Sequence, residues 1–273
     1  MNMHAQPTAI VTGASSGIGR ASAEALVRAG FKVFGTSRRA TGSCGPGNVT
    51  MLACDVTDDA SVSSLVATVL SQAGRIDILV NNAGIGLIGG AEESSAEQAQ
   101  AMFDVNVFGV IRMTNAVLPI MRKQRSGRII NLSSVLGFIP APFSALYSST
   151  KHALEGYTES LDHELRAHAI RAILIEPAYT KTPFDQNAVF PDRPLPAYET
   201  ARLHATTVIG EAMKTADDPR LVADVIVKAA TAAKPKSRYT VGKLASRLSL
   251  LRRFVPAFAF DKSLRKQLGL EQV

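Results

Sequence analysis

Short apolar runs alternate along this chain with longer stretches in which apolar residues recur at helical spacing. The short runs predict strands, and the stretches between them predict helices with one buried face. Strands separated by helices favour a doubly wound α/β architecture, a parallel sheet with helices on both faces. The predicted strands cover residues 8–11, 32–36, 49–53, 76–80, 128–132, 171–175 and 238–242, and the predicted helices about 18–29, 57–73, 96–124 and 147–167, with another opened by residues 218–219.

Breaks in this pattern set the remaining boundaries. Glycine and serine between positions 41 and 48 predict a loop, Thr57 is a candidate N-cap, and Pro119 is a candidate bend in the long helix. Four prolines between positions 183 and 196 loosen the pattern over residues 180–218, which we interpret as a mobile lid or specificity segment. No linker or internal repeat divides the 273 residues, so the sequence predicts one domain spanning 1–273.

Composition narrows the class of protein. Apolar residues make up 46% of the chain and charged residues 19%, which favours a buried core over disorder. The first residues lack the basic and apolar regions of a secretory signal, and no apolar run reaches membrane-spanning length. Cys44 and Cys54 have no metal-ligand spacing, and the histidines indicate no metal site either. We interpret the cysteines as reduced thiols of a cytoplasmic protein.

Candidate chemistry centres on Tyr147 and Lys151, which are four residues apart in a predicted helix. That spacing places both side chains on one face, about one turn apart. A nearby cation favours phenolate, so it would lower the tyrosine pKa from about 10 by roughly one to three units. Ser134 follows the predicted strand 128–132, where a hydroxyl can point into the ligand crevice of an α/β sheet. Taken alone, the Tyr147–Lys151 pair favours a solvated helix face over a catalytic site.

A glycine-rich turn lies between the first strand and the first helix. Gly13, Gly17 and Gly19 follow the spacing Gly-x-x-x-Gly-x-Gly, with Ser15, Ser16 and Ile18 between them. Glycines let a backbone approach a pyrophosphate closely, and the helix N-terminus presents N–H donors to the anion. The turn therefore predicts a dinucleotide site.

These motifs together resemble the classical short-chain dehydrogenases/reductases, over about residues 8–242, with a weaker similarity of the tail to hydroxysteroid- and retinol-dehydrogenase-like members. The resemblance implies a Rossmann-type fold of about seven strands, a nicotinamide cofactor and tyrosine-based acid/base catalysis. It also implies pairing of subunits into a dimer or tetramer through the helices near 96–124 and 147–167. The residues that it assigns to catalysis are Asn106, Ser134, Tyr147 and Lys151, and those that it adds to the glycine turn for cofactor binding are Asp55, Val56, Asn82, Ala83, Gly84, Pro177, Thr180 and Thr182.

The end of the second strand indicates which nicotinamide cofactor is used. An acidic residue there would bind the ribose 2′-hydroxyl and repel a 2′-phosphate. Ser37 occupies the position, and Arg38 and Arg39 follow it. Arginine binds phosphate through paired, charge-assisted hydrogen bonds, so we expect NADP(H) rather than NAD(H). The alternative is that the two arginines are only solvated surface residues.

The expected reaction is hydride transfer between the cofactor and a carbonyl or alcohol. Tyr147 would protonate the carbonyl oxygen, and Ser134 would donate a hydrogen bond to it. By resemblance, Lys151 also holds the nicotinamide ribose and Asn106 positions a water. Ser133 should point away, as a strand neighbour does. One departure is Pro177-Ala178, where the family usually has Pro-Gly and where alanine disfavours a positive φ.

The segment 180–218 and the tail 243–273 carry the remaining signals. The segment's apolar residues suit an apolar substrate, or simple packing on the core; they are Phe184, Val189, Phe190, Leu195 and Tyr198. The net charge of +7 arises in the C-terminal part, which makes the tail basic. The tail has an apolar stripe at helical spacing, broken at Pro256, and its members are Leu244, Leu248, Leu251, Val255 and Phe258.

Two interpretations of the tail stay open, and so do two alternatives to a simple reductase, one of which is an isomerase or dehydratase on the same fold. Docking of the tail onto this subunit or a neighbour is favoured over lying on a membrane surface. A non-catalytic NADP(H)-binding regulator is the main alternative to an enzyme. Nucleic-acid binding is not expected, because the basic tail lacks a recognised motif.

Overall fold

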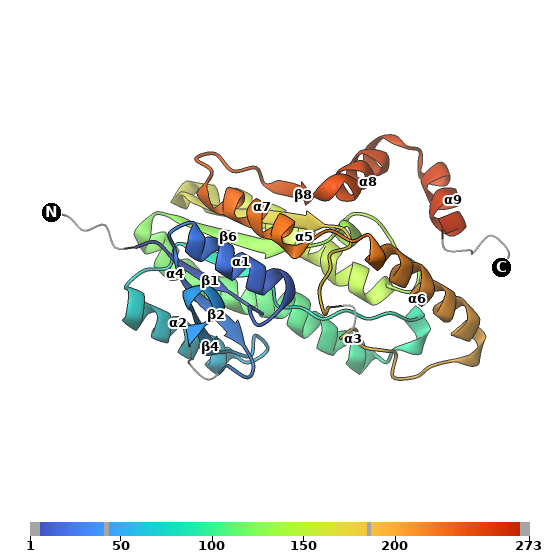
Figure 1. Cartoon of the computed structure of the whole chain (residues 1–273), viewed down its shortest axis with the longest axis horizontal. Coiled ribbons are helices and arrows are strands. Elements are labelled where there is room, and N and C mark those ends of the chain that lie inside the picture. Colours follow the sequence, from blue (N-terminus) through green and yellow to red (C-terminus); the bar gives the residue numbers. More distant parts are fainter. Residues whose placement is uncertain (1–5, 41–43, 185–186, 268–273) are drawn as a thin grey trace.

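One parallel sheet organises the chain. The computed structural model describes residues 6–40, 44–184 and 187–267. Their strands pair in the order β3-β4-β2-β1-β5-β6-β7-β8, and every pairing is parallel except that of β3 with β4 at one edge (Figure 1). The strands are β1 (Thr8–Val11), β2 (Lys32–Ser37), β3 (Cys44–Gly45), β4 (Val49–Ala53), β5 (Ile78–Asn81), β6 (Gly127–Leu132), β7 (Ile170–Pro177) and β8 (Arg238–Val241).

Helices cover both faces of this sheet, so the predicted doubly wound α/β fold is confirmed. Leu26 of α1 and Ile226 of α7 belong to one apolar cluster with the sheet. Leu65 of α2, Met113 of α4 and Leu161 of α5 belong to a second cluster with it. The helices are α1 (Gly17–Arg28), α2 (Asp59–Ala73), α3 (Ala96–Phe103), α4 (Gly109–Gln124), α5 (Ala145–Leu165), α6 (Glu199–Lys214), α7 (Pro219–Thr231), α8 (Gly242–Phe254) and α9 (Ala257–Gln267).

Three local expectations differ from the structure. Asp58, not Thr57, caps α2, because its carboxylate accepts hydrogen bonds from the N–H groups of Ala60 and Ser61. The loop expected over 41–48 contains the short strand β3, although residues 41–43 lie outside the described ranges. The long helix expected over 96–124 runs on through Pro119 and is interrupted earlier, by a π-helical segment at Asp104–Phe108.

The stretch Ala96–Gln124 also qualifies the expectation that no segment could span a membrane. By its length, and by a mean hydropathy of 1.2 over 18 of its residues, it could cross a bilayer. Met113, Val117 and Met121 on α4 are fully buried and join the second apolar cluster. We therefore interpret the stretch as a core helix of the α/β domain.

The segment 180–218 is held against the loop that follows β5, apart from residues 185–186, which are outside the described ranges. Val189 forms a β-bridge with Leu87. The hydroxyl of Ser95 donates to the carboxylate of Asp192 at 2.5 Å. Farther along, Arg202 of α6 pairs with the completely buried carboxylate of Glu93. These contacts hold the segment in place, and its interpretation as a mobile lid stays a prediction.

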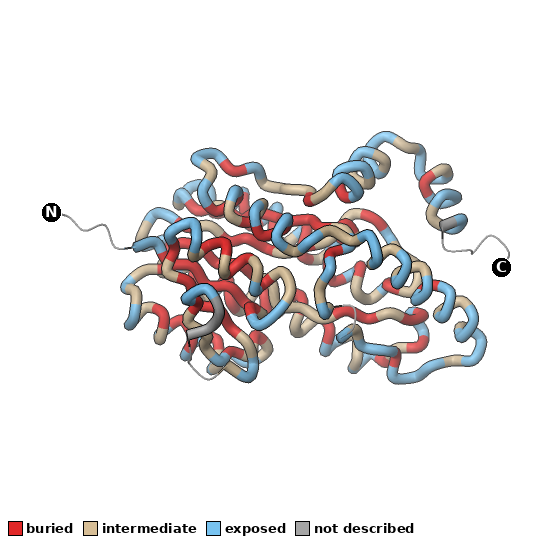
Figure 2. Tube along the Cα trace, in the orientation of Figure 1, coloured by how far each residue is buried: buried red, intermediate tan, exposed pale blue. Residues whose placement is uncertain are grey.

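The tail forms two helices separated at Pro256, as the sequence predicts. One side of them packs on the body of the protein: Leu248, Leu251 and Val255 lie against the cluster that contains Val135 and Ile139. Both helices lie at one end of the molecule, and much of their surface is exposed (Figures 1 and 2). The predicted stripe is only partly correct, because Leu244 and Phe258 are exposed.

Candidate active site

The glycine turn follows β1 directly and opens α1. Gly13 has φ of +65° and Gly17 has φ of +53°, a backbone region that favours glycine. A Cβ atom on Gly19 would overlap the carbonyl oxygen of Gly13 and the Nδ2 atom of Asn82. Ser16 is the N-cap of α1, and its side chain makes no capping hydrogen bond. The turn thus leaves N–H groups of the first helical turn available for an anion.

A threonine hydroxyl joins this turn to the end of β5. Oγ1 of Thr12 accepts hydrogen bonds from the N–H groups of Asn82, at 2.9 Å, and Ala83, at 3.0 Å. In return, Nδ2 of Asn82 donates to the carbonyl oxygens of Thr12, at 2.8 Å, and Gly13, at 3.1 Å. The Asn82-Ala83-Gly84 motif therefore holds the glycine turn in position from the neighbouring strand.

Asn106 lies in the π-helical segment and links two parts of the site. Its Oδ1 atom accepts a hydrogen bond from the N–H of Ile85, and its Nδ2 atom donates to the carbonyl oxygen of Ile85, each at 2.9 Å. Its Nδ2 atom also donates to Oγ1 of Thr150 at 3.2 Å, and that hydroxyl donates to the carbonyl oxygen of Tyr147 at 2.7 Å. The loop after β5 is thereby fixed to the helix that carries Tyr147.

Tyr147 and Lys151 lie one turn apart on α5. Nζ of Lys151 is 5.6 Å from the centroid of the Tyr147 ring and donates to the carbonyl oxygen of Leu132 at 2.8 Å. Burial lowers the pKa of Lys151 to about 8, while the negative charge of Glu155 opposes that change. The ring of Phe184 lies 5.8 Å from that of Tyr147, centroid to centroid.

The two serines after β6 have different partners. Oγ of Ser134, which is half-buried, accepts from the N–H of Leu136 at 3.2 Å and caps a single helical turn. Ser133 is buried, and its hydroxyl donates to the carboxylate of Glu155. The prediction that Ser133 points away from Ser134 agrees with these contacts.

Two buried carboxylates lie behind this site and share one arginine. Arg238 of β8 pairs with Glu155 at 2.8 Å and with Glu176, which ends β7 together with Pro177. Burial, then repulsion by Glu155, raises the pKa of Glu176 to about 8. One carboxyl group of this pair thus stays protonated near neutral pH, and the guanidinium of Arg238 also pairs with the exposed carboxylate of Glu159 at 2.8 Å.

The residues expected at the adenosine end gather after β2 and β4. Arg38 and Arg39 are exposed, and Val56 is buried. Hydrogen bonds from the N–H and hydroxyl of Thr57 lower the pKa of Asp55, and the positive charge of Arg38 adds to this effect. Arg38 and Asp55 therefore lie near one another at this edge.

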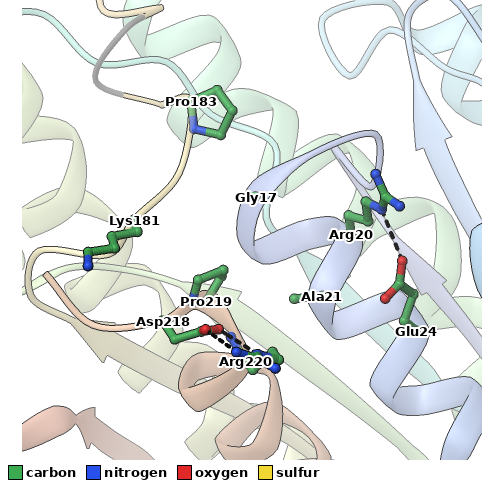
Figure 3. A pocket seen from close by; sticks show the side chains of 9 residues that line it. All are labelled: Gly17, Arg20, Ala21, Glu24, Lys181, Pro183, Asp218, Pro219 and Arg220. Atoms are coloured by element: carbon green, nitrogen blue, oxygen red, sulfur yellow. Dashed lines mark hydrogen bonds and ion pairs between the residues drawn. The ribbon is translucent and has the colours of Figure 1, made fainter.

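The turn after β7 accommodates the alanine that departs from the family pattern. Ala178 is not among the described residues with positive φ, so it is not strained there. Thr180 is buried, and Thr182 contacts the glycine turn, since a Cβ on Gly17 would lie 3.0 Å from its Cβ. A hollow of about 340 Å³ next to this contact is lined from α1, α7 and the start of the 180–218 segment (Figure 3). Tyr147 and Ser134 do not line it, so it is not the reaction centre.

Sequence reasoning did not assign a role to Thr12, Thr150, Glu155 or Arg238. Two of them had a signal: Thr150 and Glu155 flank Lys151 on its own helix, at i−1 and i+4. Arg238 had none, because only the pairing of β8 with β7 brings it to Glu176.

The glycine turn, the Asn82 motif and the Tyr147–Lys151 pair meet at the carboxyl ends of β1, β5 and β6. A family model described as short chain dehydrogenase matches residues 7–191. The chain belongs to the short-chain dehydrogenase family. It is therefore an oxidoreductase that acts on CH–OH or C=O groups by hydride transfer with a nicotinamide nucleotide.

Curated relatives support this assignment. The 3-ketodihydrosphingosine reductase of Bacteroides thetaiotaomicron is 37% identical over 237 residues, which cover 86% of this short-chain dehydrogenase and 87% of the relative. The 17-beta-hydroxysteroid dehydrogenase type 1 of Mus musculus is also 37% identical, over 255 residues that cover 85% and 73% of the two chains.

Solved structures agree. A short-chain dehydrogenase from Streptomyces avermitilis matches with a TM-score of 0.83 and 32% identity over the whole of both chains. A Burkholderia phymatum short-chain dehydrogenase/reductase in complex with NAD matches with a TM-score of 0.77 and 28% identity, covering 92% and 94% of the chains. A serine dehydrogenase complexed with NADP+ matches with a TM-score of 0.73 and 27% identity, covering 85% and 93%.

Proposed function

We propose that this dehydrogenase uses NADP(H) to interconvert an apolar carbonyl compound and its alcohol, with Tyr147 as the proton donor in reduction. The observation that carries the proposal is the position of Lys151. Its buried ammonium lies beside the Tyr147 ring and is oriented by the carbonyl oxygen of Leu132, two residues before Ser134. The phenol of Tyr147, the ammonium of Lys151 and the hydroxyl of Ser134 thus belong to one site.

The residues present fit a nicotinamide dinucleotide. The turn has two glycines with positive φ, and a side chain at Gly19 would collide with the carbonyl oxygen of Gly13. Gly13, Ser15, Ser16, Gly17 and Ile18 would surround the pyrophosphate, and Thr180 and Thr182 would approach the nicotinamide end. The bound cofactor supplies or accepts the hydride.

The protein's own groups handle the proton and the developing charge. In reduction, the hydroxyl of Tyr147 passes its proton to the substrate oxygen, and the hydroxyl of Ser134 donates a hydrogen bond to the same oxygen. The ammonium of Lys151 favours the phenolate that remains. Asn106 fixes the loop after β5 to α5 and so keeps the nicotinamide side of the site in register with Tyr147.

The preference for NADP(H) is supported by Arg38 and Arg39. Both are exposed next to Ser37, where no carboxylate would repel a 2′-phosphate. The carboxylate of Asp55, an acid on which the charge of Arg38 acts, already accepts two hydrogen bonds from Thr57, which keep it directed toward that residue. Related structures hold either NAD or NADP+, so the choice depends on these residues of the chain itself.

An apolar substrate is supported by the surroundings of Tyr147. Phe184 lies against its ring, and the 180–218 segment that carries Phe184 is bonded to the loop after β5. The two relatives described above are named for a ketodihydrosphingosine and a hydroxysteroid, both largely apolar molecules. We also propose a cytoplasmic homodimer or homotetramer, since the family's pairing helices correspond to α4 and α5.

The decisive experiment follows NADPH absorbance while the enzyme is offered ketones, aldehydes and alcohols of increasing apolar size. Turnover with NADPH should exceed turnover with NADH at equal concentration. Faster turnover with NADH would contradict the cofactor proposal. Tight NADPH binding without turnover of any carbonyl would support a regulator instead.

A further inference from the structure

The outer side of α8 and α9 exposes large apolar side chains. Phe258 is 78% exposed, Phe254 is 72% exposed and Leu250 is 60% exposed, while Leu248 and Leu251 on the opposite side pack on the protein. A folded chain normally buries such residues or uses them at an interface. We call Leu250, Phe254 and Phe258 the outer apolar set.

The helices that carry the outer apolar set are also basic, although Arg252 is directed inward and donates to the carbonyl oxygen of Phe138. Between positions 243 and 266 the chain has seven lysines and arginines against one acid, Asp261. All seven are exposed. The guanidinium of Arg253 lies 5.5 Å from the centroid of the Phe254 ring, so cation and aromatic ring are presented together. A surface of this kind attracts an anionic partner and also offers it apolar contact.

A second copy of this chain does not suit the surface. Two-fold pairing through the same face would place the basic side chains of the two copies opposite one another, and like charges oppose association. Phosphate of a nucleic acid would pair with the arginines but would leave the aliphatic Leu250 in water. Anionic phospholipid headgroups with hydrocarbon beneath them match both parts of the surface.

We propose that α8 and α9 dock the enzyme on the surface of an anionic bilayer. The helix break at Pro256 lies between Phe254 and Phe258, and it allows two short helices to lie along one surface in place of a single helix. Basic side chains bind the headgroups, and the outer apolar set enters the boundary of the acyl chains. The inner side of the same helices packs on residues 135–139, directly after Ser134. Docking therefore brings the wall of the candidate active site close to the membrane.

The test measures binding of the full chain to lipid vesicles by flotation, without cofactor or substrate. Vesicles of phosphatidylcholine alone are compared with vesicles of equal parts phosphatidylcholine and phosphatidylglycerol. The enzyme should float with the anionic vesicles only, and high salt should release it. The double variant Phe254→Ser/Phe258→Ser should bind at least about tenfold more weakly, because two aromatic side chains no longer leave water.

A matched control replaces an exposed phenylalanine elsewhere. Phe108 is 49% exposed and ends the π-helical segment before α4, outside α8 and α9; Phe108→Ser should bind vesicles like the unaltered enzyme. The double variant should keep its melting temperature and its turnover of a water-soluble carbonyl, which separates this proposal from the proposed function. No binding to anionic vesicles, or equal binding by the double variant, would overturn it. Self-association or nucleic-acid binding that the double variant loses would overturn it as well.

Discussion

The ammonium of Lys151 on α5 donates to the carbonyl oxygen of Leu132, the last residue of β6, at 2.8 Å. This bond ties the helix that carries Tyr147 to the strand end that carries Ser134. It also gives the buried ammonium an uncharged polar partner. A carboxylate in that place would neutralise the ammonium, whereas a carbonyl oxygen does not. The positive charge therefore remains available to act on Tyr147.

The state of Lys151 should set the alkaline limit of carbonyl reduction. Burial lowers its pKa to about 8, so the ammonium is lost as pH rises through that value. Glu155, one turn further along α5, favours the ammonium. Glu155→Gln should therefore move the falling limb of the kcat/KM profile to lower pH, by up to about one unit. Glu164→Gln, on the exposed side of the same helix, should leave the profile unchanged. A shift of equal size in both variants would contradict this role for Glu155.

Glu176 should make folding stability depend on pH. Its pKa is raised to about 8 in the folded protein from 4.5, because burial and the negative charge of Glu155 oppose ionisation. The folded state thus binds more protons between these values, and stability should fall as pH rises from 5 to 8. The slope contributed by one group is at most about 1.4 kcal/mol per pH unit.

Urea unfolding of Glu176→Gln at several pH values checks this expectation. The variant should show a flatter dependence, while the exposed control Glu211→Gln should keep the original one. An unchanged slope in Glu176→Gln would mean that the carboxyl group ionises normally when the protein is folded.

Loss of the Thr150 hydroxyl should lower kcat more than loss of the hydroxyl of its neighbour Ser149. It accepts from Asn106 and donates to the Tyr147 carbonyl, whereas the hydroxyl of Ser149 donates to Leu146 on the exposed face of α5. Thr150→Val keeps the shape but leaves the Asn106 amide one partner short, which costs roughly 1–3 kcal/mol when a group is buried. We expect kcat to fall about tenfold or more in Thr150→Val and to stay near its original value in Ser149→Ala. Equal activity of the two variants would show that the hydroxyl of Thr150 does not support catalysis.

Arg38 should decide the choice of cofactor. Arg38→Ser removes a cation from the predicted 2′-phosphate site, so KM for NADPH should rise about tenfold or more while KM for NADH changes little. Arg122→Ser, at the exposed end of α4, serves as the control for loss of one surface charge. A rise of KM for both cofactors would instead indicate a general effect on the nucleotide site.

Local patterns were sufficient to predict the sheet and most helices. Apolar runs such as Ile78–Asn81 are short and fully buried, and a glycine can mark a helix end, as Gly74 does for α2. The π-helical segment was not predicted, because it depends on the amide of Asn106 bonding a distant loop at Ile85. The five residues Asp104–Phe108 contain no proline or glycine, and Gly109, which follows them, has ordinary helical dihedral angles.

In the candidate site, too, local motifs predicted some features and tertiary packing decided the others. Motif spacing was enough to bring together the glycine turn, Asn82, Ser134, Tyr147 and Lys151. The supporting contacts were not predictable: Glu155 of α5 meets Arg238 of β8 because α5 packs on β7, which pairs with β8, and the 180–218 segment is held by the Glu93–Arg202 ion pair across more than a hundred residues. Both depend on tertiary packing of polar groups, which apolar periodicity does not report.

The central claim is that the phenol of Tyr147 carries the proton in a reaction whose hydride comes from a nicotinamide. Tyr147→Phe removes only the hydroxyl and keeps the ring against Phe184. Turnover and NADPH binding of this variant, measured side by side with the most active carbonyl, test the claim directly. We predict that kcat falls by about 10²–10⁴-fold while NADPH affinity is kept. Turnover near the original rate would show that another group supplies the proton.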